Sequence, residues 1–486
     1  MKTQNKEITI EKSNGRIYTP DFIVENILDL SGYYGDKILN KHVIDNSCGD
    51  GAFLRKIVQR YCEESARLVI DKNIVKEELG NYIHGIEIER AERDKCINNI
   101  EEVANSYGIY GVNWDIICGD ALKEHKFDGK MDYVLGNPPY IRVHNLGENV
   151  EDIKKFSFAQ SGMTDLFIVF YEIGLKMLKS TGTLGYITPS SFFNSVAGAY
   201  MRKVFVEDNL ISSIVNLRHF QAFMATTYTT IVVLKKNKEK KELDYYQYDE
   251  KNLIPYYVDT LAPDDFYISS NYYFAKKGDL KTLKRILFNL GKSDIAVKNG
   301  YATLCDSVFI NVFSFQSKHI ISVIKASTGE LKEIIYPYNK QAQLVPEEEL
   351  AKEKELYEYL ILNKKALLKR SNEKDTNKYW YAFGRSQAIK DTYTDKLTIN
   401  ALLRTKEDWK FTLAKKGVGV YGGLYIISDT ISYDKIKETL RSDEFVSYIT
   451  LLGKYKSGGY YTFSSKDVKA YLDFKFAYNG GIFDYD

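Results

Sequence analysis

The sequence HVIDNSCGDGAF, residues 42–53, is the stretch that decides the fold. Its first residues form a short apolar run of the kind that makes a buried strand, and this run ends in Asp45. Gly49 and Gly51 then let the chain turn tightly into the helical pattern that follows, so that backbone N–H groups can approach a ligand closely. Leu54 stands where the dinucleotide-binding fingerprint has a third glycine. The loop therefore favours an adenosine-bearing ligand that lacks a pyrophosphate.

Strand-like and helical patterns alternate along the chain after this loop. Such alternation is typical of an α/β fold with a mostly parallel sheet. The interval between Gly51 and Glu87 is long for this fold, so residues 65–80 are expected to form an inserted loop or an extra helix. We predict helices at 52–65 and 165–180 and strands at 42–48, 82–89, 115–121, 131–140, 183–193 and 228–236.

The length of 486 residues is too great for one ordinary core and predicts two domains. A charge run, KKNKEKKE at 235–242, follows the last of these strands; it is either a solvated turn or the place where the first domain ends. We therefore predict domains at 1–244 and 245–486, the second of them α+β. Its expected elements are a helix at 346–369 and strands at 331–338, 397–403, 423–429 and 459–463.

The charges are distributed unevenly between the two halves. Lys plus Arg number 67 and Asp plus Glu number 65, so the net charge is +2 and does not indicate a class of binding partner. Residues 251–486, however, hold 36 basic and 29 acidic side chains, a surplus of +7 that is offset by −5 in residues 1–250. This asymmetry indicates that an anionic partner meets the second half, although a solvated basic face would look the same.

The five cysteines form no C-x-x-C pair and no zinc-ligand spacing with histidine, so we predict neither a metal site nor a disulfide scaffold. The first residues are polar, unlike a signal peptide, and no apolar run approaches the ~18 residues of a membrane span. The simplest interpretation is a protein of the reducing cytosol without a membrane partner.

Acidic residues stand at the ends of three successive expected strands, namely Asp45, Glu87 and Asp120. Ligands of open α/β sheets bind at the carboxyl ends of the strands. A carboxylate at the position of Glu87 takes ribose hydroxyls in nucleotide-binding folds, and one at Asp120 could accept a hydrogen bond from an adenine amino group. Each acid has a structural alternative, because Glu87 could cap the next helix and Asp120 could be an ordinary N-cap.

The motif Asn137-Pro138-Pro139-Tyr140 follows the fourth of these strands and is the most specific chemical signal in the chain. The two prolines fix the backbone and remove two N–H donors. What remains is a rigid pair of acceptors, the Asn137 side-chain oxygen and the Pro138 carbonyl, followed by the aromatic face of Tyr140. This set suits a planar group that bears an NH₂.

The combined pattern resembles the amino-directed DNA methyltransferases, specifically the TaqI-like γ class of adenine-N6 enzymes. That class begins with a Tyr-Thr-Pro motif, which Tyr18, Thr19 and Pro20 match. Further matches follow in the class order: the glycine loop at 45–53, Glu87, Asp120, Asn137–Tyr140 and the segment FMATTYTTIVVL at 223–234. The class ends in a target-recognition domain, and residues 245–486 have the right size. The segment SGGYYTF at 457–463 is similar to part of that domain.

The resemblance implies a Rossmann-like methyltransferase sheet with S-adenosylmethionine as cofactor. Glu87 is then expected to hold the ribose, Asp120 the adenine amino group, and Asp45 with the glycine loop the methionine end. The side chain of Cys48 is expected to pack. The expected cofactor-binding residues are Tyr18, Thr19, Pro20, Asp45, Cys48, Gly49, Gly51, Glu87, Ile88, Asp120, Ala121 and Asn137.

The reaction implied by the resemblance is methyl transfer to adenine N6 of a base flipped out of duplex DNA. Asn137, Pro138, Pro139 and Tyr140 are the expected catalytic residues, with Phe223 as the second aromatic on the base and Phe220 as the alternative. The class suggests a monomer in the prokaryotic cytoplasm, associated with the nucleoid. It acts as a solitary methylase or beside a separately encoded restriction endonuclease. Because few residues precede Tyr18, we expect no fused nuclease there.

Two other functions fit the motif. A protein-glutamine or rRNA methyltransferase uses the same Asn-Pro-Pro-Tyr chemistry, but a peptide substrate does not require the large basic second half. A non-catalytic DNA-binding protein on a methylase fold is disfavoured by the intact motifs. The candidate DNA contacts of the second half are Arg370, Lys378, Arg385, Arg404, Lys415, Lys416, Lys454 and Lys456, each of which could equally be a surface charge.

Overall fold

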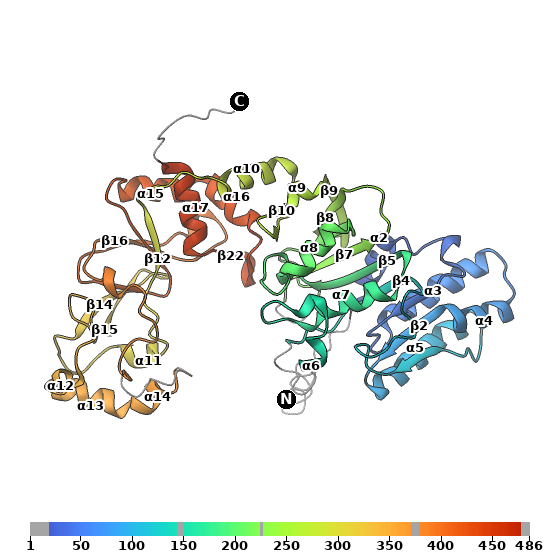
Figure 1. The fold of residues 1–486 in the computed structure, drawn as a ribbon, viewed down its shortest axis with the longest axis horizontal. Coiled ribbons are helices and arrows are strands. Elements are labelled where there is room, and N and C mark those ends of the chain that lie inside the picture. The colour runs from blue at the N-terminus through green and yellow to red at the C-terminus, as the bar shows by residue number, and fades with distance from the viewer. Residues whose placement is uncertain (1–18, 143–149, 224–226, 371–378, 478–486) are drawn as a thin grey trace. The chain divides into compact units, whose positions relative to one another are not determined.

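The structure is a computed structural model that describes residues 19–142, 150–223, 227–370 and 379–477. The chain divides into two compact units, Met1–Lys281 and Thr282–Asp486. They are coloured blue to yellow-green and yellow to red in Figure 1. No helix in the described ranges is long and apolar enough to cross a membrane.

The first unit is built on a mixed sheet. Among the described residues it has nine strands in the order β3-β2-β1-β4-β5-β7-β6-β8-β9. The strands are β1 (Val43–Asp45), β2 (Ile83–Glu87), β3 (Asp115–Cys118), β4 (Met131–Gly136), β5 (Leu178–Pro189), β6 (Ile211–Asn216), β7 (Thr229–Lys235), β8 (Leu243–Asp249) and β9 (Ile254–Leu261).

The first five strands of this order are mutually parallel. Val43 of β1 pairs with Ile83 of β2 on one side and with Tyr133 of β4 on the other, and β3 and β5 extend the parallel set at its two sides. β7 then runs antiparallel to both β5 and β6. Because β1 to β4 all point the same way, their carboxyl ends lie along one edge of the sheet, as the sequence pattern predicted.

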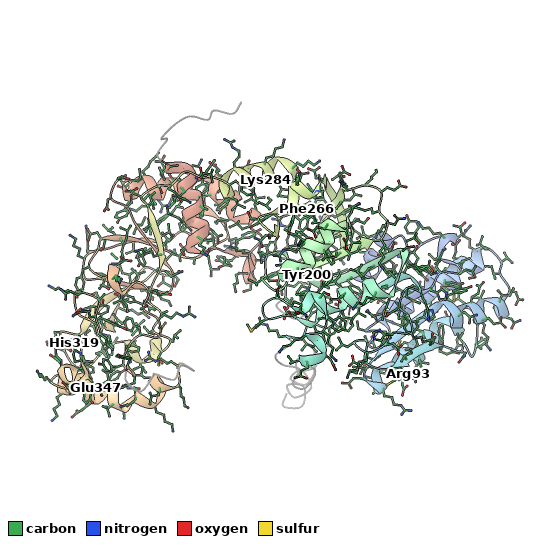
Figure 2. The ribbon with its side chains drawn as sticks, viewed as in Figure 1. Arg93, Tyr200, Phe266, Lys284, His319 and Glu347 are labelled. Atoms are coloured by element: carbon green, nitrogen blue, oxygen red, sulfur yellow. The ribbon has the colours of Figure 1, made fainter. Side chains whose placement is uncertain are left out.

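Helices cover both faces of the sheet (Figure 1). Ile187 of β5 belongs to the core that α2, α3 and α5 form on one face, whereas its neighbour Tyr186 contacts Tyr171 of α7 on the other. Arg93 of α5, labelled in Figure 2, donates to the Ile116 carbonyl and ties this helix to β3. The helices are α2 (Asp21–Ser31), α3 (Ala52–Arg67), α4 (Lys72–Tyr82), α5 (Arg90–Ser106), α6 (Val150–Ile153), α7 (Leu166–Met177), α8 (Ala199–Glu207) and α9 (Pro263–Phe266), with the hairpin β10 (Tyr267–Ile268) and β11 (Asn271–Tyr272) after them.

The first unit extends further along the chain than the sequence indicated. We predicted a domain end at residue 244, but β8 pairs with β6 and β9 pairs with β8, so the sheet continues to Leu261 and the unit to Lys281. The charge run at 235–242 is the turn before β8 rather than a linker. The extra helix expected near 65–80 is confirmed as α4.

The second unit contains three small sheets among its described residues. Their orders are β12-β20-β16-β18, β13-β15-β14-β19 and β17-β22-β21. The strands are β12 (Ala296–Asn299), β13 (Ile310–Asn311), β14 (Ile320–Lys325), β15 (Glu330–Ile335), β16 (Lys396–Ile399), β17 (Leu402–Leu403), β18 (Phe411–Ala414), β19 (Gly419–Tyr421), β20 (Leu424–Ile427), β21 (Tyr455–Lys456) and β22 (Tyr460–Thr462). The helices are α10 (Lys277–Leu287, which spans the division between the units), α11 (Asp306–Phe309), α12 (Glu347–Leu350), α13 (Lys354–Leu362), α14 (Lys364–Leu368), α15 (Tyr433–Leu440), α16 (Asp443–Leu451) and α17 (Ser465–Phe476).

Two elements of this unit differ from the sequence prediction. The expected helix at 346–369 is three short helices, because the chain turns after Leu350 and again at Asn363. The expected strand at 397–403 is broken at Asn400 into β16 and β17. The Asn400 amide donates to the carbonyls of Leu402 and Asp408 and accepts from the backbone N–H of Lys410, so it holds the chain in a bend.

Candidate active site

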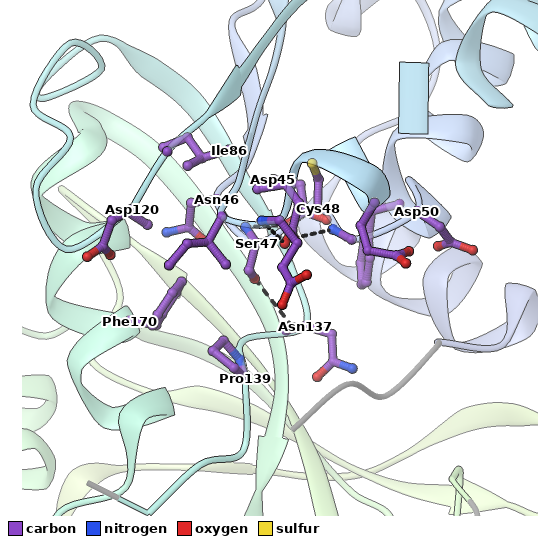
Figure 3. Close-up of a pocket in the computed structure, with 18 of the residues that line it drawn as sticks. Asp45, Asn46, Ser47, Cys48, Asp50, Ile86, Asp120, Asn137, Pro139 and Phe170 are labelled. Atoms are coloured by element: carbon purple, nitrogen blue, oxygen red, sulfur yellow. Dashed lines mark hydrogen bonds between the residues drawn. The ribbon is translucent and has the colours of Figure 1, made fainter. Parts of the chain in front are cut away.

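A cavity of about 240 Å³ opens at the carboxyl edge of the first sheet. Figure 3 shows Asp45, Asp50 and Asp120 around it, with Asn137 and Pro139 below them in the view. Of the predicted site residues, those that line the cavity are Thr19, Asp45, Cys48, Gly49, Glu87, Ile88, Asp120, Ala121, Asn137 and Pro139. Pro20, Gly51, Pro138, Tyr140 and Phe223 are not among its lining, and Tyr18 lies outside the described residues.

The glycine loop is shaped by hydrogen bonds within it and to β2. The Cys48 N–H donates to the Ile86 carbonyl, and the Gly51 N–H donates to the Cys48 carbonyl. Gly49 and Gly51 have φ of +52° and +93°, in the left-handed region that favours glycine. A Cβ atom on Gly51 would also lie 2.9 Å from Cys96 Sγ of α5. Gly51 therefore allows α3 to begin close to α5, and it shapes the loop through its backbone conformation rather than through a side chain.

Cys48 lines the cavity but is a packing residue. It is 4% exposed, and its sulfur lies against the position where Gly85 would carry a Cβ. The adjacent Cys96 thiol, burial and nearby carboxylates raise the pKa of Cys48 well above its usual range. The thiol thus stays protonated, as the sequence analysis expected of a packing side chain.

Asp45 is the most deeply buried acid of the cavity, with an exposed fraction of 2%. Burial raises the pKa of its carboxyl to about 7; the Ser47 N–H, which donates to Oδ1 at 3.0 Å, lowers it, and the charge of Glu87 raises it further. A Cβ atom on Gly136 would approach Asp45 Oδ1 to 2.6 Å. Gly136, directly before the Asn137 motif, is therefore required for the close packing of β4 on this carboxyl.

Glu87 links the end of β2 to the glycine loop. Its Oε2 accepts from the Gly49 N–H at 3.0 Å, and its Oε1 accepts from the Glu89 N–H at 2.9 Å. The first bond fixes the loop, and the second closes a turn before α5, whose N-cap is Glu89. A carboxylate oxygen can accept more than one hydrogen bond, so these contacts are compatible with the expected ribose hydroxyls.

Asp120 follows β3 and closes a turn. Its Oδ1 accepts from the Leu122 N–H at 3.0 Å, and Lys123 Nζ lies 4.0 Å from Oδ2. The turn places Ala121 and Leu122 in the cavity wall, and Ile88 and Phe170 are also part of this wall. Ile88 is 63% exposed, so the wall offers apolar surface to a planar ring next to the Asp120 carboxylate.

Asn137 joins the cavity to the Asn-Pro-Pro-Tyr turn. Its Nδ2 donates to Thr19 Oγ1 at 3.1 Å, and its own carbonyl accepts from Ser47 Oγ at 3.4 Å. The first bond orients the amide, so that Oδ1 is its acceptor atom. Pro138 is buried, which fixes the backbone that follows. Thr19 of the Tyr-Thr-Pro motif therefore lines the cavity and also orients the Asn137 amide.

Tyr140 extends from this turn into an aromatic group. Its hydroxyl donates to the Ile187 carbonyl at 3.1 Å, and its ring meets those of Phe167 and Phe223 edge-on, at centroid distances of 6.3 and 6.2 Å. Phe220 instead stacks on Tyr248 at 4.8 Å. Of the two candidates for the second aromatic, only Phe223 contacts Tyr140 among the described ring contacts.

Several cavity residues were not predicted from the sequence. Asn46 is 1% exposed, and its Oδ1 accepts from the Tyr186 hydroxyl at 2.9 Å, which anchors the loop to β5. Its polarity directly after a strand was a usable signal. Phe170 comes from α7 and carries no local signal, because only the packing of α7 on the sheet brings it here. The other missed lining residues include Ser47, Asp50, Glu89, Glu92, Ile141 and Leu166.

The cavity is strongly acidic. Six carboxylates line it, namely those of Asp45, Asp50, Glu87, Glu89, Glu92 and Asp120, and no basic side chain occurs among its described lining residues. This donor set fits S-adenosylmethionine, which carries a sulfonium and an ammonium group, and the backbone N–H groups of the glycine loop suit its carboxylate. An anionic nucleotide would be repelled.

Residues 39–223 match the model of the Eco57I restriction-modification methylase family. The chain is 33% identical over 245 residues to the Type II methyltransferase M.BstVI of Geobacillus stearothermophilus, which covers 47% of this chain and 43% of that protein. It is 24% identical over 512 residues to the Type II restriction enzyme and methyltransferase RM.Eco57I of Escherichia coli, with 83% and 50% covered. The chain thus spans about half the length of these relatives.

The fold is shared with a solved restriction-modification enzyme. The structure of the Type IIL enzyme MmeI in complex with DNA aligns with a TM-score of 0.62 at 13% identity, and the alignment covers 91% of this chain and 63% of that one. The shared fold is therefore a mixed α/β sheet followed by further structure, as predicted. At this identity the likeness concerns the fold alone.

Proposed function

We propose that this chain is a DNA methyltransferase that transfers a methyl group from S-adenosylmethionine to adenine N6 of a base flipped out of duplex DNA. One observation carries the proposal: Asn137 and Pro139 of the Asn-Pro-Pro-Tyr turn line the same cavity as the acidic cofactor residues. A planar amino group held by the turn would therefore lie next to the cofactor. The match of residues 39–223 to a restriction-modification methylase family supports DNA as the substrate.

Different residues of the first unit contact different parts of the cofactor. The N–H groups of the glycine loop and Asp45 hold the methionine end, Glu87 accepts from the ribose, and the wall of Ile88 and Ala121 encloses the adenine ring beside Asp120. When bound, S-adenosylmethionine supplies an electrophilic methyl group on its sulfonium. The carboxylates favour the positively charged cofactor over its neutral-sulfur product, because the Coulomb attraction is lost on transfer.

The Asn-Pro-Pro-Tyr turn activates the target amino group. Adenine N6 is a poor nucleophile because its lone pair is delocalised into the ring. The Asn137 Oδ1 and the Pro138 carbonyl accept its two N–H hydrogens, which favours a pyramidal nitrogen and releases the lone pair. As positive charge develops on the nitrogen, these hydrogen bonds strengthen, so they stabilise the transition state more than the ground state.

Tyr140 and Phe223 stabilise the flipped base. Unstacking the base costs a few kcal/mol, and each aromatic contact returns about 1–3 kcal/mol. Tyr140 is held by its bond to Ile187, so its ring offers a fixed face, and Phe223 meets it edge-on at 76°. This geometry supports face stacking on Tyr140 and an edge contact from Phe223.

We assign target recognition to the second unit, as the sequence analysis did for residues 245–486, with the structural boundary now after Lys281. Its surplus of basic side chains supports contact with the DNA backbone. The chain is proposed to act as a monomer in a prokaryotic restriction-modification setting. Whether a nuclease is separate stays a prediction, because RM.Eco57I combines both activities and this chain covers half of it.

Nucleoside mass spectrometry tests the proposal. The purified protein is incubated with S-adenosylmethionine and mixed-sequence duplex DNA, and the DNA is digested and analysed. N6-methyladenine is the expected product. N4-methylcytosine would retain the site chemistry and correct the base. Cofactor binding without any methylated nucleoside would contradict the proposal and favour a protein or RNA amino group.

A further inference from the structure

The β17–β22–β21 sheet of the second unit brings together sequence features that the active site does not use. β21 and β22 are joined through Ser457-Gly458-Gly459, the start of the SGGYYTF segment, and Leu402–Leu403 forms the third strand. Arg404 follows directly after this third strand. Two basic candidates from the sequence, Arg404 and Lys456, thus meet on one small sheet.

The register divides the side chains of this sheet between two faces. Tyr461 pairs with both Leu403 and Tyr455, and Leu403 and Tyr461 are 1% and 7% exposed, so they form the inner face. Because side chains alternate along strands, their neighbours point the other way. The outer face consists of Leu402, Arg404, Lys456, Tyr460 and Thr462.

The outer face is basic and aromatic. The Arg404 guanidinium lies over the Tyr460 ring at 5.3 Å, and Lys456 pairs directly with Tyr460 in the register. Arg404 and Lys456 are exposed, and in the part of the chain that the structure describes neither forms an ion pair. Leu402 adds an apolar side chain that is 43% exposed. The Asp408 carboxylate accepts from the backbone N–H of Arg404 at 2.8 Å but forms no ion pair with its guanidinium.

The connection at the tip exposes backbone. Gly458 and Gly459 have φ of +75° and +79°, which directs the chain through a turn that a larger residue would strain. Ser457 and Gly458 are exposed, so the tip offers N–H groups and a hydroxyl rather than bulky side chains. Such groups are frequent contacts of phosphate oxygens.

Other basic candidates are engaged within the second unit. Arg370 donates to the carbonyls of Thr303, Leu367 and Trp380, and Lys454 pairs with Asp467 at 2.6 Å. Lys415 lies 3.7 Å from Asp395. Lys378 lies outside the described residues. These contacts engage Arg370, Lys415 and Lys454 within the second unit.

We propose that the outer face of the β17–β22–β21 sheet is a docking surface for duplex DNA, on which Arg404 and Lys456 contact phosphates and Tyr460 holds Arg404 in place. The proposal rests on the proposed function and names the residues of its recognition unit. Charge complementarity selects the partner, since two exposed cations that form no ion pair among the described residues suit a polyanion. A narrow antiparallel ribbon also fits the width of a DNA groove.

Salt-dependent binding tests the surface. The full-length wild type and the variants Arg404→Gln, Lys456→Gln and the double variant are titrated with a fluorescent duplex of mixed sequence at a series of KCl concentrations. Each lost phosphate contact lowers the slope of log affinity against log salt by about 0.9, so the double variant should lose about 1.8. Tyr460→Leu should weaken binding with an unchanged slope, because it removes no charge.

Arg441 provides the matched control. It is an exposed arginine of the same unit that also lies over an aromatic ring, Phe411 at 5.0 Å, but it is not part of this sheet. Arg441→Gln should keep the wild-type slope. Limited proteolysis, followed through peptides of the second unit for every variant, confirms that the mutated unit is folded.

Two outcomes would contradict the proposed docking surface. In the first, the double variant keeps the wild-type slope while the wild type binds and methylates DNA, which leaves the proposed function intact. In the second, Arg441→Gln loses as much as the double variant, which shows a general effect of charge. A wild type that neither binds nor methylates duplex DNA would instead overturn the proposed function together with this surface.

Discussion

Replacing Asp45 by asparagine is expected to stabilise the cofactor-free protein at neutral pH and to leave its stability unchanged in acid. The folded-state pKa of this carboxyl is about 7, against an ordinary value of 3.8. Between these values the folded protein holds a proton that the unfolded chain has lost, so its free energy of unfolding falls as the pH rises. A difference of about 3 pKa units corresponds to about 4 kcal/mol.

The assay compares wild type and Asp45→Asn by pulse proteolysis in urea from about pH 4 to about pH 8, where the linkage acts. Peptides from residues 43–118 report the opening of the first sheet alone. The variant's advantage should grow by about 1.4 kcal/mol per pH unit from about pH 4 to about pH 7 and then stay constant. Asparagine keeps the volume and the oxygen that accepts from Ser47, so packing is matched.

Asp120→Asn is the control, because this carboxyl of the same cavity has a side chain that is 23% exposed. Its replacement removes a cavity carboxyl group that is not fully buried, and so separates the effect of burial from the effect of cavity charge. An Asp45→Asn difference that is constant across the pH range, or that grows toward acid, would refute the reasoning that burial opposes the charge of Asp45.

The remaining predictions concern the catalytic turn, the aromatic group and a histidine. Asn137→Ala should keep DNA binding and lose nearly all methyl transfer, measured as turnover and affinity. Phe223→Ala should destabilise the flipped base by about 1–3 kcal/mol. With 2-aminopurine as the target base, this variant should give a smaller fluorescence change on binding, whereas Phe220→Ala should leave the fluorescence change as in the wild type. Burial lowers the pKa of His84 to about 4 in the folded protein. The stability that neutral His84 contributes is therefore complete above pH ~6.5. The free energy of unfolding falls by about 3 kcal/mol as the pH falls toward 4, because the unfolded chain binds the proton more readily. In urea unfolding, His84→Gln should remove this fall.

Each of these three predictions has an outcome that would contradict it. Wild-type turnover in Asn137→Ala would remove the amide from the mechanism. Equal fluorescence effects of the Phe223 and Phe220 variants would show that the contact with Tyr140 does not select the aromatic. An acid transition that is identical with and without His84 would assign the loss of stability to other groups.

Much of the candidate site could be predicted because its residues lie at strand ends. Asp45, Glu87 and Asp120 each follow a short apolar run, and parallel strands bring such positions to one edge whatever the details of packing. The Asn137 motif is equally local, since its prolines fix its backbone. Strand direction thus brings these residues to one edge, whereas the part of the cavity wall that α7 supplies depends on packing.

Other features have no local signal. β8 was missed because its partner is β6 rather than β7, the strand before it in the chain, and because the charged turn at 235–242 was interpreted as the end of the domain. The break of the strand at Asn400 depends on a side chain that bonds forward to Asp408 and Lys410. The segment 346–369 is helical in composition, but the structure interrupts it after Leu350 and at Asn363.

The sequence by itself determined the α/β class, the place of the cofactor loop and the acceptors of the catalytic turn, because these depend on residues a few positions apart. Only the tertiary structure decided that the first unit continues to Lys281, that Phe223 rather than Phe220 contacts Tyr140, and that the Asp45 carboxyl is buried. It also decided that Arg370 bonds to carbonyls while Arg404 remains exposed. The physical reason is that burial, pKa and ring contacts are set by segments far apart in the chain, whose distances only the folded packing fixes.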